Sequence, residues 1–209
     1  MVAPMSPRDR LTTARLYLVC DARPRDWLAA AVRGGVDLVQ LRDKALDDER
    51  LVAAAEEFRG LGALFVLNDR PHLVEACGAD GVHVGQDDAT PAEARAIVGP
   101  ERVVGRSTHA PEQADAADAD PDVDYLAVGP VWETPTKAGR PAAGLEYVKY
   151  AARTVSKPWF AIGGIDAGNL AAVLERGARR IVVVRAIAEA EDPEAAAREL
   201  AEGLCLTTA

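Results

Sequence analysis

Short apolar segments alternate with helical patterns along almost the whole chain, and this alternation restricts the fold more than any other feature. The apolar segments are rich in β-branched residues, as in strands that are covered on both faces. We expect strands over residues 16–20, 36–41, 63–67, 81–84, 102–105, 125–128, 159–162 and 180–184. We expect helices over residues 26–33, 47–59, 71–77, 91–98, 111–119, 145–154, 167–176 and 193–204.

Parallel strands joined by right-handed helical crossovers form either an open, doubly wound sheet or a closed barrel. Eight such units within 209 residues favour the barrel. No linker or change in composition divides the chain. We therefore expect an α/β protein with a single (β/α)8 TIM barrel as its catalytic domain over residues 15–209, preceded by a flexible N-terminal tail over residues 1–14.

The charge and the apolar content exclude several classes of protein. The net charge of −9 argues against non-specific binding to nucleic acid or to an anionic membrane. No apolar run approaches the roughly 20 residues of a membrane span, and the first residues have no signal-peptide core. We expect a cytoplasmic protein. A homo-oligomer is possible, but it cannot be derived from the sequence. Cys20, Cys77 and Cys205 lie far apart and are expected to be small hydrophobes.

Polar residues gather where the strands end, which is where TIM barrels place their chemistry. Gln40, Arg42 and Lys44 alternate at the exit of the second strand, so a continued strand would put them on one face, with roughly 6–7 Å between alternate residues. Two cations and an amide at this position suit an anionic ligand. A solvated loop with ordinary surface charges is the alternative.

Carboxylates follow the third and fourth strands. Asp69 lies after the third, and Asp87 and Asp88 lie after the fourth. Mg²⁺ prefers one or two carboxylates together with ligand phosphates and water, so these exits could share a divalent cation. The alternatives are a helix N-cap at Asp69 and turn chemistry at Asp87 and Asp88. His83 stands between two valines and is expected to be a core histidine with its hydrogen bonds satisfied.

The remaining exits carry hydroxyls, glycines and a stiff loop. Ser107 after the fifth strand is a candidate polar contact, and His109 beside it is a candidate acid or base. Glycines over 163–164 and backbone N–H groups over 184–185 are typical of a phosphate site, although glycines also serve tight turns. The loop over residues 129–139 contains two prolines, two threonines and a lysine, and is either a site for an anion or a surface turn.

Taken together and in this order, the motifs resemble the thiamine-phosphate synthase family, and the match spans nearly the whole chain after the tail. The segments that carry the resemblance are Gln40 to Lys44, Asn68 with Asp69, Gly81 to Asp88, Ser107, Gly129 to Val131, Thr134 to Lys137, and Ile162 to Ile165. The resemblance implies a (β/α)8 barrel that joins hydroxymethylpyrimidine diphosphate to thiazole phosphate, with magnesium, and releases pyrophosphate.

The resemblance also implies roles for individual residues. The pyrimidine diphosphate would be held by Gln40, Leu41, Arg42, Asp43, Lys44, Asn68, Ser107 and Lys137. The thiazole phosphate would be held by Thr134, Pro135, Thr136, Gly164, Val184 and Arg185, and Mg²⁺ by Asp69 and Asp88. Arg42, Lys44, Ser107 and Lys137 would act in catalysis. Arg185 and Arg180 depart from the family, which usually has serine and glycine at these positions.

The implied chemistry is dissociative. Pyrophosphate leaves once its charge is neutralised, a pyrimidine carbocation forms, and the thiazole nitrogen attacks it. This route needs no strong base and no covalent nucleophile. Two alternatives stay open. A thiazole tautomerase of the same barrel group would use His109 as proton carrier but would leave Arg42 and Asp69 without a role. The other alternative is a non-catalytic sensor that binds phosphorylated ligands.

Overall fold

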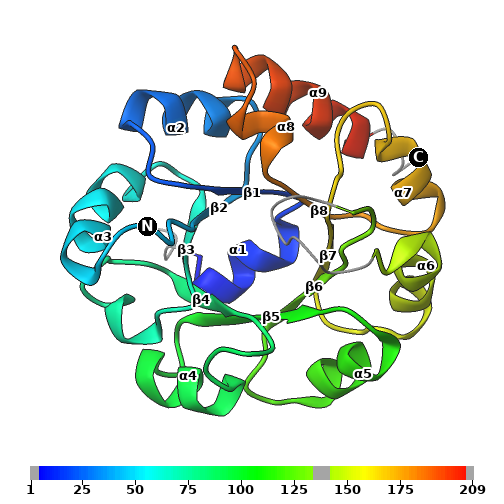
Figure 1. The fold of residues 1–209 in the computed structure, drawn as a ribbon, viewed down its shortest axis with the longest axis horizontal. Coiled ribbons are helices and arrows are strands. Elements are labelled where there is room, and N and C mark those ends of the chain that lie inside the picture. The colour runs from blue at the N-terminus through cyan, green and yellow to red at the C-terminus, as the bar shows by residue number, and fades with distance from the viewer. Residues whose placement is uncertain (1–4, 134–141, 206–209) are drawn as a thin grey trace.

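Eight parallel strands close into a barrel in chain order, each paired with its neighbours in sequence and β8 paired with β1 (Figure 1). The computed structural model describes residues 5–133 and 142–205. The strands are β1 (Leu16–Cys20), β2 (Leu38–Leu41), β3 (Leu64–Asn68), β4 (Gly81–Val84), β5 (Val103–Thr108), β6 (Tyr125–Val128), β7 (Trp159–Ile162) and β8 (Ile181–Val183). The predicted TIM barrel is thereby confirmed.

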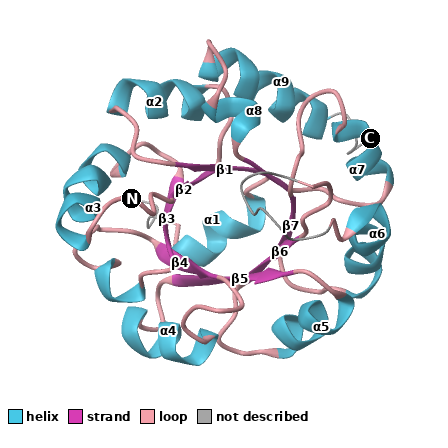
Figure 2. Cartoon of the chain, in the orientation of Figure 1, coloured by secondary structure: helices cyan, strands magenta, loops and turns pink. Residues whose placement is uncertain are grey.

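Helices form an outer ring around the strands (Figure 2). They are α2 (Arg25–Arg33), α3 (Asp48–Ala55), α4 (Pro91–Val98), α5 (Pro111–Ala119), α6 (Gly144–Thr154), α7 (Leu170–Glu175), α8 (Arg185–Ala188) and α9 (Pro193–Cys205), with 3-10 turns η1 (Glu56–Phe58) and η2 (Pro71–Leu73). Within the described ranges, no helix combines the length and the apolarity that crossing a membrane requires.

Among the elements that differ from the sequence prediction are the helix expected over residues 71–77, strand β5 and helix α8. The helix expected over residues 71–77 is only the turn η2, and the chain continues to Gly78 through turns such as the hydrogen bond from the N–H of Gly78 to the carbonyl oxygen of Glu75. Strand β5 continues to Thr108 rather than ending at Gly105, so Ser107 lies within the strand. The short helix α8 directly after β8 was not expected.

The barrel has two separate cores. Alternate strand residues point inward, where the rings of Tyr17, Tyr125 and Phe160 meet edge to face with centroids 5.4–6.1 Å apart. The other residues of each strand pack against the surrounding helices in a larger apolar layer. Both faces of every strand are therefore buried, which explains the nearly continuous apolar runs in the sequence.

A repeated aspartate fastens the beginnings of the strands. Asp37, Asp80 and Asp124 stand directly before β2, β4 and β6. Their carboxylates accept the backbone N–H of a residue on the preceding strand, namely Leu16 at 3.0 Å, Phe65 at 2.9 Å and Val104 at 2.7 Å. Arg180 occupies the corresponding place before β8.

The N-terminal segment is a helix that closes the floor of the barrel, so the prediction of a flexible tail is wrong for this part of residues 1–14. Helix α1 (Pro7–Thr13) begins at a capping box between Ser6 and Asp9, and in the view of Figure 1 it projects onto the middle of the ring of strands. Leu11 is 2% exposed and belongs to the interior core. The apolar pattern of the sequence did not indicate this helix, because Leu11 is its one large apolar residue. The burial of Leu11 depends on the assembled barrel.

Arg180 holds the end of α1 in place. Its guanidinium donates to the carbonyl oxygens of Ala14 at 3.0 Å and Thr12 at 2.8 Å. Burial, together with the nearby charge of Arg15, lowers the pKa of Arg180. Because hydrogen bonds from a charged donor are lost, Arg180→Met is expected to lower the free energy of unfolding by about 1–2 kcal/mol in urea denaturation.

The matched control for this variant is Arg153→Met. Arg153 is an exposed arginine in the last turn of α6. Its replacement is expected to change the free energy of unfolding by no more than about 0.5 kcal/mol. Equal unfolding midpoints and slopes for the two variants would contradict the anchoring role of Arg180.

Candidate active site

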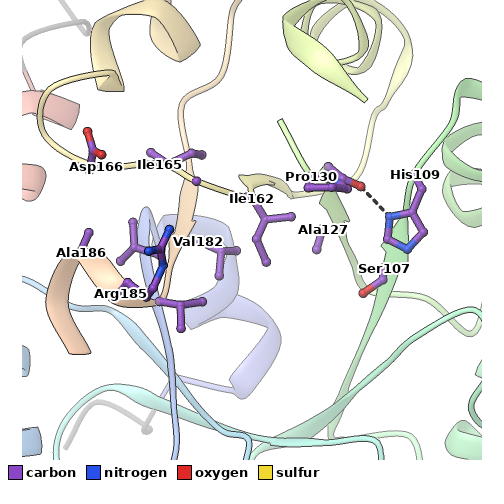
Figure 3. A pocket seen from close by; sticks show the side chains of 15 residues that line it. Ser107, His109, Ala127, Pro130, Ile162, Ile165, Asp166, Val182, Arg185 and Ala186 are labelled. Carbon is purple, nitrogen blue, oxygen red and sulfur yellow. Dashed lines mark hydrogen bonds between the residues drawn. The ribbon is translucent and has the colours of Figure 1, made fainter. Parts of the chain in front are cut away.

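The C-terminal ends of the strands surround a mouth where residues that the structure describes line three cavities. The largest, of about 270 Å³, lies between β5, β6, β7 and β8 (Figure 3). A second, of about 220 Å³, is lined by residues after β2 and β3. A small one of about 50 Å³ lies between them at the top of the barrel interior. Ser107 lines both the largest and the small cavity, and Asn68 lines both the small cavity and the second. The three cavities therefore adjoin one another across the mouth.

The basic residues after β2 lie where the period-two pattern predicted. Gln40 and Arg42 line the small cavity together. Lys44 lies farther out, beside the second cavity, with its ammonium 3.6 Å from a carboxylate oxygen of Asp69. The structure thus brings an amide and two cations to one side of the mouth.

Leu41 and Asp43 take structural positions in the same segment. Leu41 is 1% exposed and packs in the layer between strands and helices. The carboxylate of Asp43 accepts the backbone N–H of Ala45 at 3.1 Å and of Ala22 at 3.4 Å. It therefore joins the loop after β2 to the loop after β1, and both residues still line the second cavity.

Asp69 and Asp88 form the acidic part of the site. Burial and the neighbouring carboxylate of Asp88 raise the pKa of Asp69, while Lys44 opposes the shift. Asp69 has a φ of 58°, and the turn η2 has no side-chain cap, so the N-cap alternative is wrong. Among the residues that the structure describes, no group of three metal-ligating side chains exists. Two facing carboxylates fit Mg²⁺, which completes its shell with phosphate and water.

The loop that carries Asp88 is fastened to β5. Asp88 accepts the backbone N–H of Gly85 at 2.9 Å, so the turn alternative holds for this side chain as well. Arg106 donates to the carbonyl oxygen of Gly85 at 2.5 Å, and Gln86 donates to the carbonyl oxygen of Ser107 at 2.6 Å. Burial lowers the pKa of Arg106, and nearby carboxylates counter this shift. Arg106 could not be predicted as a site residue from the sequence, because it points outward from β5 and belongs to no motif.

Glycines shape the opposite side of the mouth. Gly163 and Gly164 have φ of 107° and 70°, a region that other residues rarely enter. A Cβ on Gly163 would lie 2.5 Å from that of Pro130, so the chain approaches closely here. Gly164, Val184 and Arg185 all line the largest cavity. The three predicted phosphate residues that the structure describes are therefore brought together.

His109 faces the same cavity from the residue directly after β5. Its Nδ1 lies 2.5 Å from the carbonyl oxygen of Gly129, and Figure 3 shows it across the cavity from Arg185. Thr134, Pro135, Thr136 and Lys137 lie outside the described residues, so their predicted roles remain predictions.

His83 is a core histidine, as the sequence suggested. It is 6% exposed, and its ring nitrogens lie 3.1 Å from the hydroxyl of Tyr125 and 2.9 Å from that of Ser107. Ser107 is equally buried at 6% and forms the edge of the largest cavity. The hydroxyl of Ser107, the predicted contact residue, is therefore held from inside the barrel by its hydrogen bond with His83.

A TIM barrel whose mouth joins a basic side, a carboxylate pair and a glycine-rich side belongs to the class of enzymes that act on phosphorylated small molecules. The model of a family described as thiamine monophosphate synthase matches residues 16–187. A thiamine-phosphate synthase of Thermus thermophilus is 57% identical over 202 residues, covering 91% of this chain and 97% of the relative. The chain belongs to the thiamine-phosphate synthase family.

Two further comparisons agree with this assignment. A thiamine-phosphate synthase of Streptomyces avermitilis is 51% identical over 211 residues, covering 96% of this chain and 98% of the relative. A solved thiamine phosphate pyrophosphorylase from Pyrococcus furiosus superposes with a TM-score of 0.84 at 31% identity, covering 97% of this chain and 99% of that structure. The similarity therefore includes the whole barrel.

Proposed function

We propose that the enzyme joins hydroxymethylpyrimidine diphosphate to thiazole phosphate and releases pyrophosphate. Thiamine-phosphate synthase activity itself follows from the family. The observation that carries the assignment of the substrates is the adjoining cavities, in which Asn68 and Ser107 are shared between neighbours. A cytoplasmic location and the lack of a nucleic-acid partner remain predictions.

The two ends of the mouth suit the two substrates differently. Arg42, Lys44 and Asn68 surround the second and small cavities and would hold the diphosphate. Gly164 and the beginning of α8 line the largest cavity and would hold the thiazole phosphate. Lys137 would add a contact to the diphosphate, and Thr134, Pro135 and Thr136 would add contacts to the thiazole phosphate. The reacting atoms would then meet near Ser107, where the cavities adjoin.

The cations of the site support a dissociative reaction. In the proposed arrangement, Arg42 and Lys44 would lie beside the departing diphosphate, where negative charge grows, and fixed charges at such positions lower the barrier. Mg²⁺, held by Asp69 and Asp88, would neutralise the leaving pyrophosphate further. The thiazole phosphate is anchored at the other end of the mouth, so its ring nitrogen is held near the pyrimidine, which is catalysis by proximity.

The purified protein tests this proposal directly. Both substrates and Mg²⁺ are supplied, and thiamine phosphate and pyrophosphate are measured together. We expect them to form in equal amounts. Their absence, with a folded protein, would refute the proposal.

A thiazole tautomerase is the second candidate, because His109 lies in the largest cavity opposite Arg185. This activity would need only the thiazole-phosphate end. It would leave the pair of Lys44 and Asp69 unused. Proton exchange on thiazole phosphate in the absence of pyrimidine diphosphate would favour this alternative.

The division of the mouth predicts an unequal effect of Arg42→Ala. Loss of a charged donor is expected to weaken binding of the pyrimidine diphosphate by about 10–100-fold, while binding of thiazole phosphate changes less than about twofold. Isothermal titration calorimetry measures both. Arg50→Ala is the control, since Arg50 is an exposed cation of α3 that pairs with Asp47. Equal losses for both ligands would contradict the division.

A further inference from the structure

A continuous row of buried polar side chains crosses the barrel interior and ends at two proposed substrate residues. Gln40 donates its amide to the hydroxyl of Tyr17, whose oxygen lies 3.1 Å from that of Tyr125. The Tyr125 hydroxyl lies 3.1 Å from Nδ1 of His83, and Nε2 of His83 lies 2.9 Å from Oγ of Ser107. All five side chains are at most 6% exposed, so their hydrogen bonds to one another replace contacts with bulk water.

The amide at one end sets the direction of donation through the first half of the row. An amide nitrogen only donates, so Tyr17 must accept from Gln40. A hydroxyl has one proton, and the remaining partner of Tyr17 in the row is Tyr125. Tyr17 therefore donates to Tyr125. Burial raises the pKa of both tyrosines, which keeps these protons in place at neutral pH.

The same assignment of donors and acceptors sets the direction of the hydrogen bonds from Tyr125 to Ser107. Tyr125 accepts from Tyr17, so its own proton is directed to Nδ1 of His83. An imidazole nitrogen that accepts carries no proton, and the neutral ring then has its proton on Nε2. This N–H donates to Oγ of Ser107. Ser107 thereby accepts inside the barrel and keeps its own proton for a partner in the cavity.

We infer that Tyr17, Tyr125 and His83 are positioning residues that make Gln40 an acceptor and Ser107 a donor toward the pyrimidine diphosphate. This inference rests on the proposed function for the identity of the ligand. Diphosphate oxygens only accept, so they require the Ser107 proton. The exocyclic amino group of the pyrimidine donates, so it matches the carbonyl oxygen of Gln40. The row therefore sets which hydrogen-bonding pattern the small cavity recognises.

A change in the substrate shows what this polarity selects. In a pyrimidine with an oxo group in place of the amino group, the oxo oxygen would face the carbonyl oxygen of Gln40. Both atoms are acceptors, so no hydrogen bond could form between them. An unpaired buried acceptor is costly, so the enzyme is expected to prefer the amino substrate strongly. The inference assigns this preference to the whole row rather than to Gln40 alone.

The tautomer of His83 is the first test, and it needs no catalysis. The protein contains three histidines, so 15N-labelled imidazole signals can be assigned with the variants His72→Gln and His109→Gln. Long-range 1H–15N spectra of the free wild-type protein are expected to show His83 with a proton on Nε2 and none on Nδ1. A proton on Nδ1, alone or together with Nε2, would overturn the inference whatever the enzyme assay gives.

The second test cuts the row at its centre. Tyr125→Phe keeps the ring and removes the acceptor for Tyr17, which can then donate to the carbonyl oxygen of a rotated Gln40 amide. The preference in kcat/KM for amino over oxo substrate is expected to fall about tenfold, while the KM for thiazole phosphate stays unchanged.

Tyr147→Phe is the matched control for this variant. Tyr147 is also a buried tyrosine, and its hydroxyl donates to Thr108 Oγ1 at 2.8 Å outside the row. It is expected to lose comparable stability and to keep the full preference. An unchanged preference in Tyr125→Phe, or an equal fall in both variants, would overturn the inference. Failure of the wild-type protein to join the substrates would refute the proposed function instead.

Discussion

Asp69→Asn is expected to lower kcat/KM for the coupling reaction by about two to three orders of magnitude, the size of effect seen when one fixed charge-stabilising group is lost. Asparagine is the informative replacement because Asp69 has a φ of 58°, which asparagine tolerates better than alanine. The variant therefore removes the negative charge and leaves the backbone unstrained. Steady-state rates measured across a range of Mg²⁺ concentrations give the loss.

Direct metal binding separates this effect from a general disturbance of the site. Mn²⁺ binding to the wild-type protein, measured by electron paramagnetic resonance with pyrophosphate present, is expected to weaken in Asp69→Asn. Asp87→Asn is the control, because Asp87 is an exposed carboxylate next to Asp88 that the proposed metal site does not use. Equal Mn²⁺ affinity in Asp69→Asn and the wild-type protein would contradict the metal assignment.

Gly105→Ala is expected to lower the free energy of unfolding by about 3 kcal/mol, near the upper end for overpacking a core. A Cβ at this position would lie 2.2 Å from Cζ of Tyr125 and 2.4 Å from Nδ1 of His83. Both partners are buried rings joined to each other by a hydrogen bond, so moving either ring disturbs that contact. Glycine is thus required on β5 so that the two rings can meet inside the barrel.

Urea denaturation measures this loss, and Gly168→Ala is its control. A Cβ on Gly168 would approach no atom more closely than Asp166 Oδ1 at 3.3 Å. We expect this variant to change the free energy of unfolding by less than about 0.5 kcal/mol. A Gly105→Ala protein as stable as the control would show that the rings of Tyr125 and His83 can rearrange to admit a methyl group, which would contradict this prediction.

The barrel could be predicted because its information is local and repeated. Boundaries were predicted without error where a turn signal lies beside an apolar run, as for Gly81–Val84 and Pro91–Val98. Helix α1 could not be predicted, because Leu11 is buried by contacts with strands distant in sequence. The same limit applies to Arg180, whose partners lie on α1.

For the site, too, one part could be predicted from the sequence and another part could not. The polar residues at the strand exits could be found from sequence, since each follows an apolar run and the fold brings those ends together. The row from Gln40 to Ser107 could not. Strands buried on both faces give no signal for which residues point inward, so Tyr17 and Tyr125 read as ordinary core aromatics. Their hydrogen bonds become visible only in the register of the closed barrel.

The change from aspartate to arginine before β8 has a consequence for the order in which the chain assembles. The first three anchors each bind the strand that precedes them, so each can form as soon as its own part of the chain is present. Arg180 binds carbonyl oxygens of residues 12 and 14 instead, about as far back in sequence as the barrel allows. Contacts of such long range form late in folding. We therefore expect the floor helix and the seam between β8 and β1 to be completed late in folding, and substitutions there to change the rate of unfolding more than the rate of folding.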